Sequence, residues 1–261
     1  MVSALGYRWV YEPEGVLVIT SEELGRPVVL GHRGASAHAG DNTIQAFELA
    51  VAFGADGVEL DVRYTADSAV MLHHDADIGE MGPLVHHDQA TIRATHPEIP
   101  TLDEALDVLG DLIINVEIKN SPIDADYDPT HRMAAEIARW VAQHDLYDRV
   151  VVSSFNPETV AAVRESNQSI VTGQLVDVGF DIVGGVHEVA AAGHSWIAPY
   201  VSDLVADGGA TIGAAHAAGL RVVSWTVDEP GDIVTLTAAG IDALISNDPQ
   251  ATLLAISAMQ L

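Results

Sequence analysis

Residues 57–75, GVELDVRYTADSAVMLHHD, decide how the chain folds. They contain two β-rich runs, Gly57 to Arg63 and Ala69 to His73, with only residues 64–68 between them. A crossover between parallel strands needs about a dozen residues or more, so these two runs must pair as an antiparallel hairpin.

On both sides of this hairpin, short β-rich runs alternate with stretches of helical periodicity. The other predicted strands are Val28–His32, Leu112–Ile118, Val150–Phe155, Val171–Val176, Trp196–Tyr200, Leu220–Val227 and Ala243–Ser246. The predicted helices are Thr43–Phe53, Leu102–Leu109, Thr130–His144, Pro157–Ser166, Ile182–Ala192, Ala210–Ala218, Gly231–Ala239 and a last one from Pro249. Cap residues such as Thr101, with Glu104 three positions later, support these starts.

Without the return arm of the hairpin, eight strands remain, which is the number in a TIM (β/α)8 barrel. The alternative is a doubly wound open sheet, but GHRGASAHAG after the first strand does not have the glycine spacing of a dinucleotide fingerprint. We therefore predict an α/β protein with a TIM barrel, a hairpin after the second strand, and a short inserted segment, residues 76–100, over the barrel mouth. We expect a single domain over residues 1–261, with a motif-bearing core at about 27–250.

The composition narrows the class of protein. The chain is 48% hydrophobic and has no cysteine, so it can form a large core and has neither disulfides nor thiolate metal sites. No apolar run approaches the length of a membrane span. Residues 1–20 lack a basic stretch before an apolar one, so we predict no signal peptide and a cytoplasmic protein. The composition does not specify an oligomeric state.

The charge is strongly acidic. Eleven Lys and Arg oppose 38 Asp and Glu, giving a formal net charge of −27, and Lys119 is the sole lysine. Nucleic acid and anionic membranes require a basic face, so neither is an expected partner. The scattered acids indicate either a solubilising surface or adaptation to high salt, where self-repulsion is screened.

Chemically suggestive residues lie at the ends of three predicted strands, where TIM barrels place their active sites. The first strand ends in Gly31-His32-Arg33-Gly34, which combines a proton-transfer group with a phosphate-binding group between glycines. The alternative is a buried histidine bonded to the backbone.

Two further strands contribute acids and the sole lysine. Glu59 and Asp61 share a strand face, as do Glu117 and Lys119, because strand side chains alternate. Like charges held together are costly unless a cation neutralises them, and a hard divalent ion with oxygen ligands does so. An exposed acidic strand face would explain the first pair alone, but the combined set predicts a metal-assisted phosphate site.

The hairpin returns through His73-His74-Asp75, of which at most one histidine can enter the site because neighbours point to opposite faces. Asp75 either orients the His74 imidazole or caps the turn. Aromatic residues near the later strand ends either line a substrate pocket or fill the top of the barrel. They are Phe155, Trp196, Tyr200 and Trp225.

Taken together, these motifs resemble the glycerophosphodiester phosphodiesterase family. The resemblance rests on GHRGASAHAGDNTIQAF, GADGVELDVRYTADSAVMLHHD, IPTLDEAL, NVEIK, SSFNPETV, SWTVDEP and GIDALISNDP, from about Gly31 to Pro249. Phosphatidylinositol phospholipases C share the barrel and paired histidines, but the NVEIK and SWTVDEP blocks favour the phosphodiesterases. Where the family usually has Pro-Glu-Asn-Thr, this chain has Gly40-Asp41-Asn42-Thr43.

The resemblance implies a role for each candidate residue. Glu59, Asp61 and Glu117 would hold one divalent cation, Mg²⁺ or Ca²⁺, His32 and His74 would be the general acid and base, and Arg33 and Lys119 would bind the phosphate. The implied activity is metal-dependent hydrolysis of small-molecule glycerophosphodiesters to glycerol 3-phosphate and an alcohol, within lipid and glycerol metabolism. The alternatives are a lysophospholipase D or phospholipase C-like activity on a lipid and, less favoured, a non-catalytic phosphodiester-binding barrel.

Overall fold

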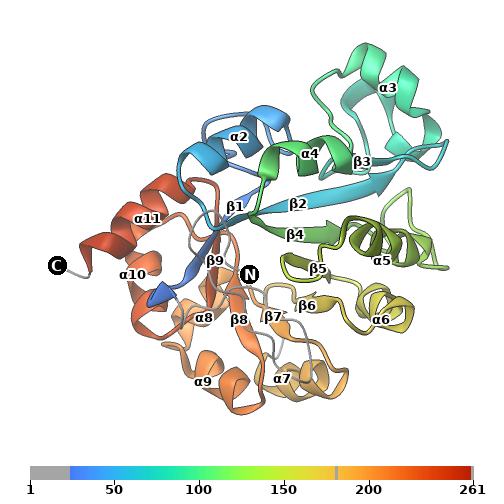
Figure 1. Cartoon of the computed structure of the whole chain (residues 1–261). Coiled ribbons are helices and arrows are strands. Elements are labelled where there is room, and N and C mark those ends of the chain that lie inside the picture. Colours follow the sequence, from blue (N-terminus) through green and yellow to red (C-terminus); the bar gives the residue numbers. More distant parts are fainter. Residues whose placement is uncertain (1–23, 180–181, 260–261) are drawn as a thin grey trace.

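The fold is described from a computed structural model of residues 24–179 and 182–259. Within these residues, eight parallel strands form a closed ring in the order β1-β9-β8-β7-β6-β5-β4-β2, and β1 pairs with β2 to close it (Figure 1). Helices between successive strands surround the ring, so the predicted TIM barrel is confirmed. No helix in the described part of the chain is long and apolar enough to cross a membrane.

The strands are β1 (Val28–His32), β2 (Gly57–Tyr64), β3 (Val70–Leu72), β4 (Ile113–Ile118), β5 (Val150–Ser154), β6 (Val171–Leu175), β7 (Trp196–Ala198), β8 (Arg221–Ser224) and β9 (Ala243–Ser246). The helices are α2 (Ile44–Ala52), α3 (Gln89–Thr95), α4 (Leu102–Leu109), α5 (Arg132–His144), α6 (Pro157–Ser166), α7 (Ile182–Ala191), α8 (Val201–Ala206), α9 (Ala210–Ala217), α10 (Pro230–Ala238) and α11 (Pro249–Ala258). Single 3₁₀ turns occupy Gly79–Met81 and Leu84–His86.

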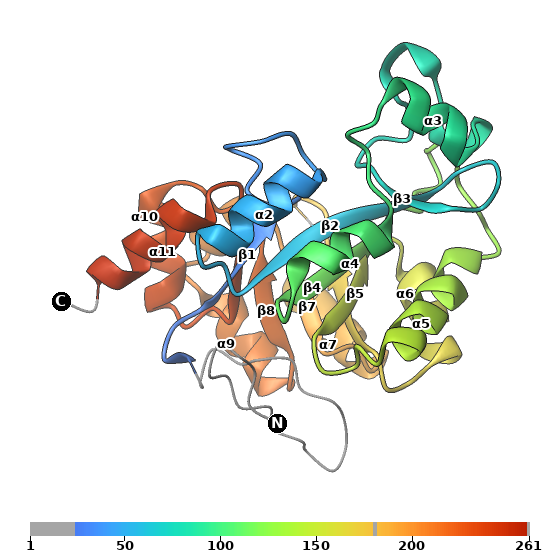
Figure 2. The ribbon, with the colours of Figure 1, turned by 45° about the horizontal axis from the view of Figure 1, so that its top comes forward.

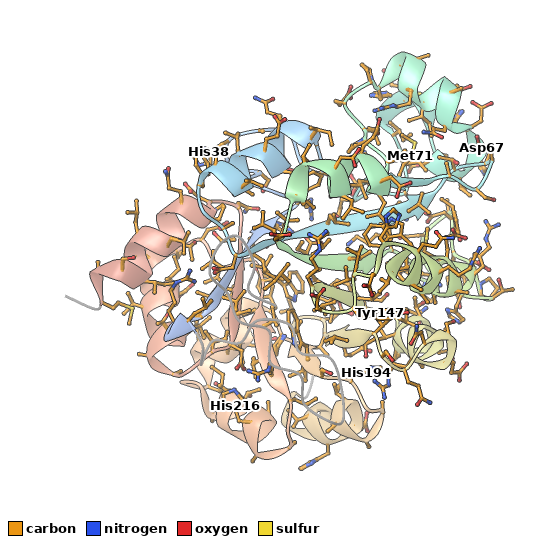
Figure 3. All side chains as sticks on the ribbon, in the orientation of Figure 1. His38, Asp67, Met71, Tyr147, His194 and His216 are labelled. Carbon is orange, nitrogen blue, oxygen red and sulfur yellow. The ribbon has the colours of Figure 1, made fainter. Side chains whose placement is uncertain are left out.

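The predicted hairpin is confirmed, and it extends β2 beyond the barrel. β3 runs antiparallel to β2 with Val62 opposite Leu72 and Tyr64 opposite Val70. Figure 3 labels Asp67 at the tip of this hairpin and Met71 on its return strand. The hairpin thereby returns the chain to the middle of β2, where the His73 N–H donates to the Asp61 carbonyl and His74 follows.

Apolar residues fill the barrel and the layer between strands and helices. The barrel interior is filled by inward-facing residues that include Leu30, Ile113, Trp196 and Ile245. Two larger clusters lie between the outer strand faces and the helices, one around α2, α4 and α5 and one around α7 to α11. Polar side chains at the carboxyl strand ends are therefore held by a rigid, close-packed scaffold.

The inserted segment contains more regular structure than the sequence pattern predicts. Residues 76–100 include α3 and both 3₁₀ turns, and they pack against the hairpin around a small core of Met71, Ile78, Leu84, Ile92 and Ile99 (Figure 2). Helix α3 has seven residues and buries only Ile92, so its sequence shows no apolar period that could reveal it.

Two other differences concern β7 and β8. The predicted elements leave residues 201–206 in a connection, but the structure has helix α8 there. Its six residues are too few to show a helical period. The predicted strand Leu220–Val227 ends at Ser224. Beyond it, Trp225 makes an isolated parallel bridge to Tyr200, and its indole Nε1 donates to the carbonyl of Ala198.

Candidate functional site

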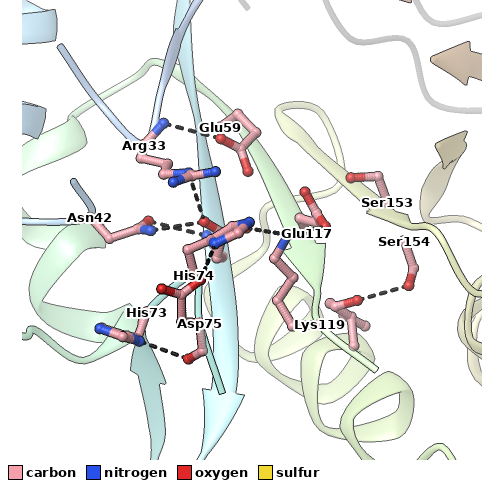
Figure 4. Close-up of polar contacts among 12 residues, drawn as sticks. Arg33, Asn42, Glu59, His73, His74, Asp75, Glu117, Lys119, Ser153 and Ser154 are labelled. Atoms are coloured by element: carbon pink, nitrogen blue, oxygen red, sulfur yellow. Dashed lines mark hydrogen bonds and ion pairs between the residues drawn. The ribbon is translucent and has the colours of Figure 1, made fainter. Parts of the chain in front are cut away.

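Three carboxylates from two neighbouring strands meet at the carboxyl end of the barrel (Figure 4). Asp61 of β2 lies directly opposite Glu117 of β4 in the parallel register, and Glu59 lies two residues earlier on the same face of β2. One oxygen from each of the three lies within 4.8 Å of the others, and all three residues are buried. The sequence-predicted acids are thus brought together.

The negative charge of the three buried carboxylates is only partly compensated by the neighbouring protein groups. Burial, followed by the charges of Asp61 and Glu117, raises the pKa of Glu59 well above its usual value. Burial likewise raises the pKa of Glu117 to about 6. Glu59 Oε1 is buried without a hydrogen-bond partner among the described residues. Three hard oxygen donors, with Glu59 Oε1 and Asp61 Oδ1 both lacking a hydrogen-bond partner among the described residues, fit a divalent cation such as Mg²⁺ or Ca²⁺.

Two cations flank the carboxylates. Lys119 Nζ lies 2.6 Å from Glu117 Oε1 and 3.1 Å from Asp61 Oδ1, and Arg33 Nε lies 3.3 Å from Asp61 Oδ2. Burial opposes ionisation of Asp61, but the charges of Lys119 and then Arg33 outweigh it and lower the pKa of Asp61 to about 2. The sole lysine of the chain is therefore part of the cluster.

The turn after β1 places Arg33 by its backbone as well as its side chain. Arg33 has a φ of 54°, and its backbone N–H donates to Glu59 Oε2 at 3.0 Å. Gly34 follows with a φ of 87°, and a Cβ there would lie 2.7 Å from Ala46 of α2. This position requires glycine both for its backbone conformation and for the close approach of α2.

Both predicted histidines line the same cavity as the cluster. His32 Nδ1 lies 2.7 Å from Asn247 Oδ1, and His74 Nδ1 lies 2.7 Å from Asp75 Oδ1. An oxygen beside Nδ1 favours the tautomer with its proton there, which leaves Nε2 to accept a proton. Burial is the largest cause that lowers the pKa of each imidazole, aided by Arg33 at His32 and by Lys119 at His74.

The cavity itself measures about 110 Å³ and has two unlike walls. The predicted site residues His32, Arg33, Glu59, His74, Glu117 and Lys119 form the polar wall. The rest of the lining, apart from Thr226, is apolar and consists of Phe155, Leu175, Trp225 and Ile245. Of the four aromatic residues singled out in the sequence, Phe155 and Trp225 line the cavity and Trp196 belongs to the barrel core. Tyr200 makes an edge-to-face contact with Trp225 at 5.0 Å between ring centroids.

Several residues that hold this site are not apparent from strand-end patterns. Asn42 receives the Asp61 backbone N–H at 3.1 Å and donates to Asp61 Oδ2 at 2.8 Å. Asp41 accepts from Arg33 Nη1 at 2.8 Å, so the carboxylate at the divergent Gly40-Asp41-Asn42-Thr43 motif faces a predicted phosphate-binding residue. Asn247 contacts His32 from the other end of the chain. Only the quoted motifs GDNT and SNDP could have signalled them.

Comparison with known proteins agrees with this geometry. The sequence profile of the glycerophosphoryl diester phosphodiesterase family matches residues 32–251. A glycerophosphodiester phosphodiesterase of Caldanaerobacter subterraneus subsp. tengcongensis is 25% identical over 242 residues, which cover 86% of this chain and 96% of that relative.

Two solved structures show the same fold. The crystal structure of a putative glycerophosphoryl diester phosphodiesterase from Silicibacter pomeroyi superposes with a TM-score of 0.77 at 25% identity and covers 90% of this chain and 95% of its own. An Oleispira antarctica phosphodiesterase, in complex with the product sn-glycerol-3-phosphate, superposes with a TM-score of 0.69 at 22% identity and covers 90% of this chain and 98% of its own. With the profile match spanning most of its length, the chain belongs to the glycerophosphoryl diester phosphodiesterase family.

Proposed function

We propose that this protein hydrolyses glycerophosphodiesters to glycerol 3-phosphate and an alcohol, with one divalent cation as cofactor. The observation that carries the proposal is the cavity lining, in which two imidazoles and two cationic side chains lie with Glu59 and Glu117, two of the three clustered carboxylates. Family membership and the product-bound Oleispira antarctica relative support the same reaction class. A protein that only binds phosphodiesters has no need of two proton-transfer groups.

In this proposal, Glu59, Asp61 and Glu117 hold the cation, which supplies positive charge to the phosphoryl oxygens when bound. Arg33 and Lys119 bind the phosphate and stabilise the negative charge that develops as the phosphorus becomes pentacoordinate. The contacts of Arg33 with Asp61 and of Lys119 with Glu117 hold both side chains beside the carboxylate cluster.

His32 and His74 move the protons. One imidazole Nε2 accepts the proton of the nucleophile, and the other imidazole donates a proton to the oxygen of the departing alcohol. Two nucleophiles fit this scheme, namely water and the neighbouring hydroxyl of the glycerol moiety. Phosphorus NMR during turnover distinguishes them, because attack by the substrate hydroxyl forms a cyclic phosphodiester and attack by water does not.

The role of His74 is tested by replacing it with alanine and measuring hydrolysis of glycerophosphocholine with Mg²⁺ or Ca²⁺. We expect kcat to fall by about 10²–10⁴-fold, as is typical of a lost general acid or base. His73→Ala is the matched control, because the His73 ring contacts the Asp75 carbonyl and does not line the cavity. Near-wild-type turnover of His74→Ala would remove His74 from the mechanism.

The apolar wall of the cavity favours a second candidate substrate class, lysophospholipids. Phe155, Leu175, Trp225 and Ile245 offer an apolar surface beside the phosphate-binding groups. A panel of glycerophosphocholine, glycerophosphoethanolamine, glycerophosphoglycerol and a lysophospholipid, assayed with each cation at low and high salt, decides between the classes. Highest kcat/KM on the lysophospholipid would favour a lysophospholipase D.

A single domain and a cytoplasmic location remain part of the proposal. The residues on which the absence of a signal peptide was predicted, 1–20, lie outside the described residues. Adaptation to high salt, one of the two explanations of the acidic composition, rests on the net charge of −27 alone.

A further inference from the structure

A buried arginine outside the proposed catalytic set occupies the same strand as two of the carboxylates. Arg63 lies two residues after Asp61 on β2, and its side chain is 3% exposed. Its guanidinium makes five hydrogen bonds, which is the number of N–H groups that it has. These go to the backbone carbonyl of His74 and to the carboxylates of Asp124 and Asp126.

The individual contacts show a two-sided clamp. Nε and Nη2 both donate to the His74 carbonyl oxygen, at 2.9 and 2.8 Å. Nη1 donates to the two carboxylate oxygens of Asp126 at 2.7 and 2.6 Å, and Nη2 donates to Asp124 Oδ2 at 2.9 Å. Asp126 is nearly as buried as Arg63, with 4% of its side chain exposed, whereas Asp124 is 25% exposed.

This clamp joins three separate segments at the rim of the barrel. Arg63 belongs to the strand that carries Glu59 and Asp61, its carbonyl partner follows the hairpin, and the two aspartates belong to the loop of residues 121–129. That loop begins just after Lys119 and Asn120 at the end of β4. One guanidinium therefore connects the backbone of His74 to β2, which carries Glu59 and Asp61. It also connects that backbone to the loop of residues 121–129, which follows Lys119.

His74 depends on such an anchor because its ring is weakly restrained by its surroundings. The His74 side chain is 39% exposed, and its ring partner Asp75 is 74% exposed. An exposed contact of this kind holds geometry poorly, because it competes with water and loses side-chain entropy. Two donors on the backbone carbonyl are by contrast buried and charge-assisted.

We propose that Arg63, held by Asp126, is a positioning residue that fixes the backbone of His74 so that its imidazole reaches the reacting atoms. The inference rests on the proposed role of His74. Misplacement of a catalytic group by about 1 Å can cost about 10²-fold in rate, so an anchor at this backbone acts on turnover. Arg63 itself does not line the cavity and is not assigned contact with substrate.

The competing explanation is that Arg63 only stabilises the fold, and the chain contains a matched control. Arg26, just before β1, makes a similar two-pronged ion pair with Asp56, just before β2, at 2.6 and 2.9 Å. This pair lies at the amino ends of its strands and away from the cavity. Lysine keeps the charge at either position but loses the planar fork of donors.

The experiment compares Arg63→Lys and Arg26→Lys in the full chain with Mg²⁺ or Ca²⁺, measuring thermal midpoint, kcat and KM for glycerophosphocholine. We expect both variants to lower the midpoint. Arg63→Lys should lower kcat about 10- to 100-fold with KM within about 3-fold of wild type, and Arg26→Lys should keep the wild-type kcat. Equal kcat values in the two variants, or a change confined to KM, would overturn the positioning role.

Amide hydrogen exchange provides a readout that does not depend on turnover. Arg63→Lys should speed exchange in residues 73–76 and 121–129, and Arg26→Lys should not. Unchanged exchange in a folded Arg63→Lys variant contradicts the proposal. If wild type hydrolyses no phosphodiester, the proposed function fails while the exchange data still test the anchor.

Asp126→Asn repeats the test if Arg63→Lys does not fold, because it keeps both bonds to His74 but weakens the clamp. This variant is expected to shift kcat and exchange in the same direction. Wild-type kcat and exchange in Asp126→Asn would overturn the proposal.

Discussion

At the scale of single residues, the site is a compromise between stability and binding. Glu59 is fully enclosed, and its carboxylate faces Asp61 and Glu117 on the same side of the barrel. A raised carboxyl pKa means that ionisation disfavours the folded state at every pH above the ordinary value of about 4.5. The metal-free protein therefore carries an electrostatic cost that a bound cation would relieve.

Glu59→Gln should accordingly raise the thermal midpoint of the metal-free protein, because it removes a buried charge while its amide oxygen can still accept the Arg33 N–H. Saturating Mg²⁺ or Ca²⁺ should raise the midpoint of wild type, by a stabilisation of about 2.7 kcal/mol at 100 times the Kd, and Glu59→Gln should abolish most of this rise. Differential scanning fluorimetry with EDTA and with each cation measures both effects. A lower metal-free midpoint would show that Glu59 stabilises the fold.

A second residue-scale prediction concerns His194, which lies outside the site (Figure 3). The residue is 7% exposed, and burial followed by the Arg164 charge lowers its pKa to about 4. Below about pH 6.5 the unfolded chain binds a proton that the folded chain does not accept until about pH 4. Stability is therefore lost as pH falls through this window. His194→Gln should remove this part of the loss. The urea midpoint should therefore fall less in the variant than in wild type between pH 7.5 and pH 5. Parallel losses would contradict the assignment.

At the scale of elements, helix α4 connects the barrel to the inserted segment. Thr101 accepts from the backbone N–H of Glu104 at 3.2 Å, and Glu104 Oε2 accepts from the backbone N–H of Thr101 at 2.8 Å. The other oxygen of Glu104 pairs with Arg93 of α3. The capping box thus stabilises the helix start and holds the insertion against it.

Thr101→Ala should cost about 1 kcal/mol of unfolding free energy, since it removes the acceptor at the start of α4. Thr95→Ala is the control, because Thr95 is exposed in α3 and a surface change of this kind stays within about 0.5 kcal/mol. Urea unfolding of both variants measures the difference. Equal small losses would mean that packing alone determines where α4 begins.

At the scale of the whole molecule, an anionic substrate must reach a site inside a protein of net charge −27. Arg33 and Lys119, together with a bound cation, form a local region of positive charge within that acidic field. Surface charges are screened by salt more strongly than the largely buried charges of the cavity. Salt therefore reduces long-range repulsion more than short-range attraction.

Raising KCl to about 1 M, where the Debye length is about 3 Å, should lower KM or leave it unchanged. The decrease should be larger for glycerophosphoglycerol, which has a net negative charge, than for zwitterionic glycerophosphocholine. Steady-state kinetics on the two substrates across the salt series provide the measurement. A steep rise in KM with salt would show that long-range attraction to the cation and its neighbours dominates instead.

The fold was predictable wherever local pattern and geometry agree. The short gap after Arg63 required a hairpin, and eight remaining strands with helices between them favoured closure into a barrel over a doubly wound open sheet. Short elements such as α3 and α8 escaped prediction, because seven and six residues do not establish a helical period. The end of β8 was misplaced because β-forming residues continue past Ser224, where only an isolated bridge from Trp225 to Tyr200 remains.

The sequence by itself determined the barrel, the hairpin and the group of strand-end acids, cations and histidines, because these depend on alternation and spacing within short stretches. Only the tertiary structure decided what holds that group in place. Asn247 contacts His32 across 215 residues, and Arg63 meets Asp126 across 63. Such contacts exist because closure of the barrel brings distant loops to one rim, and no local period in a sequence records which loops those are.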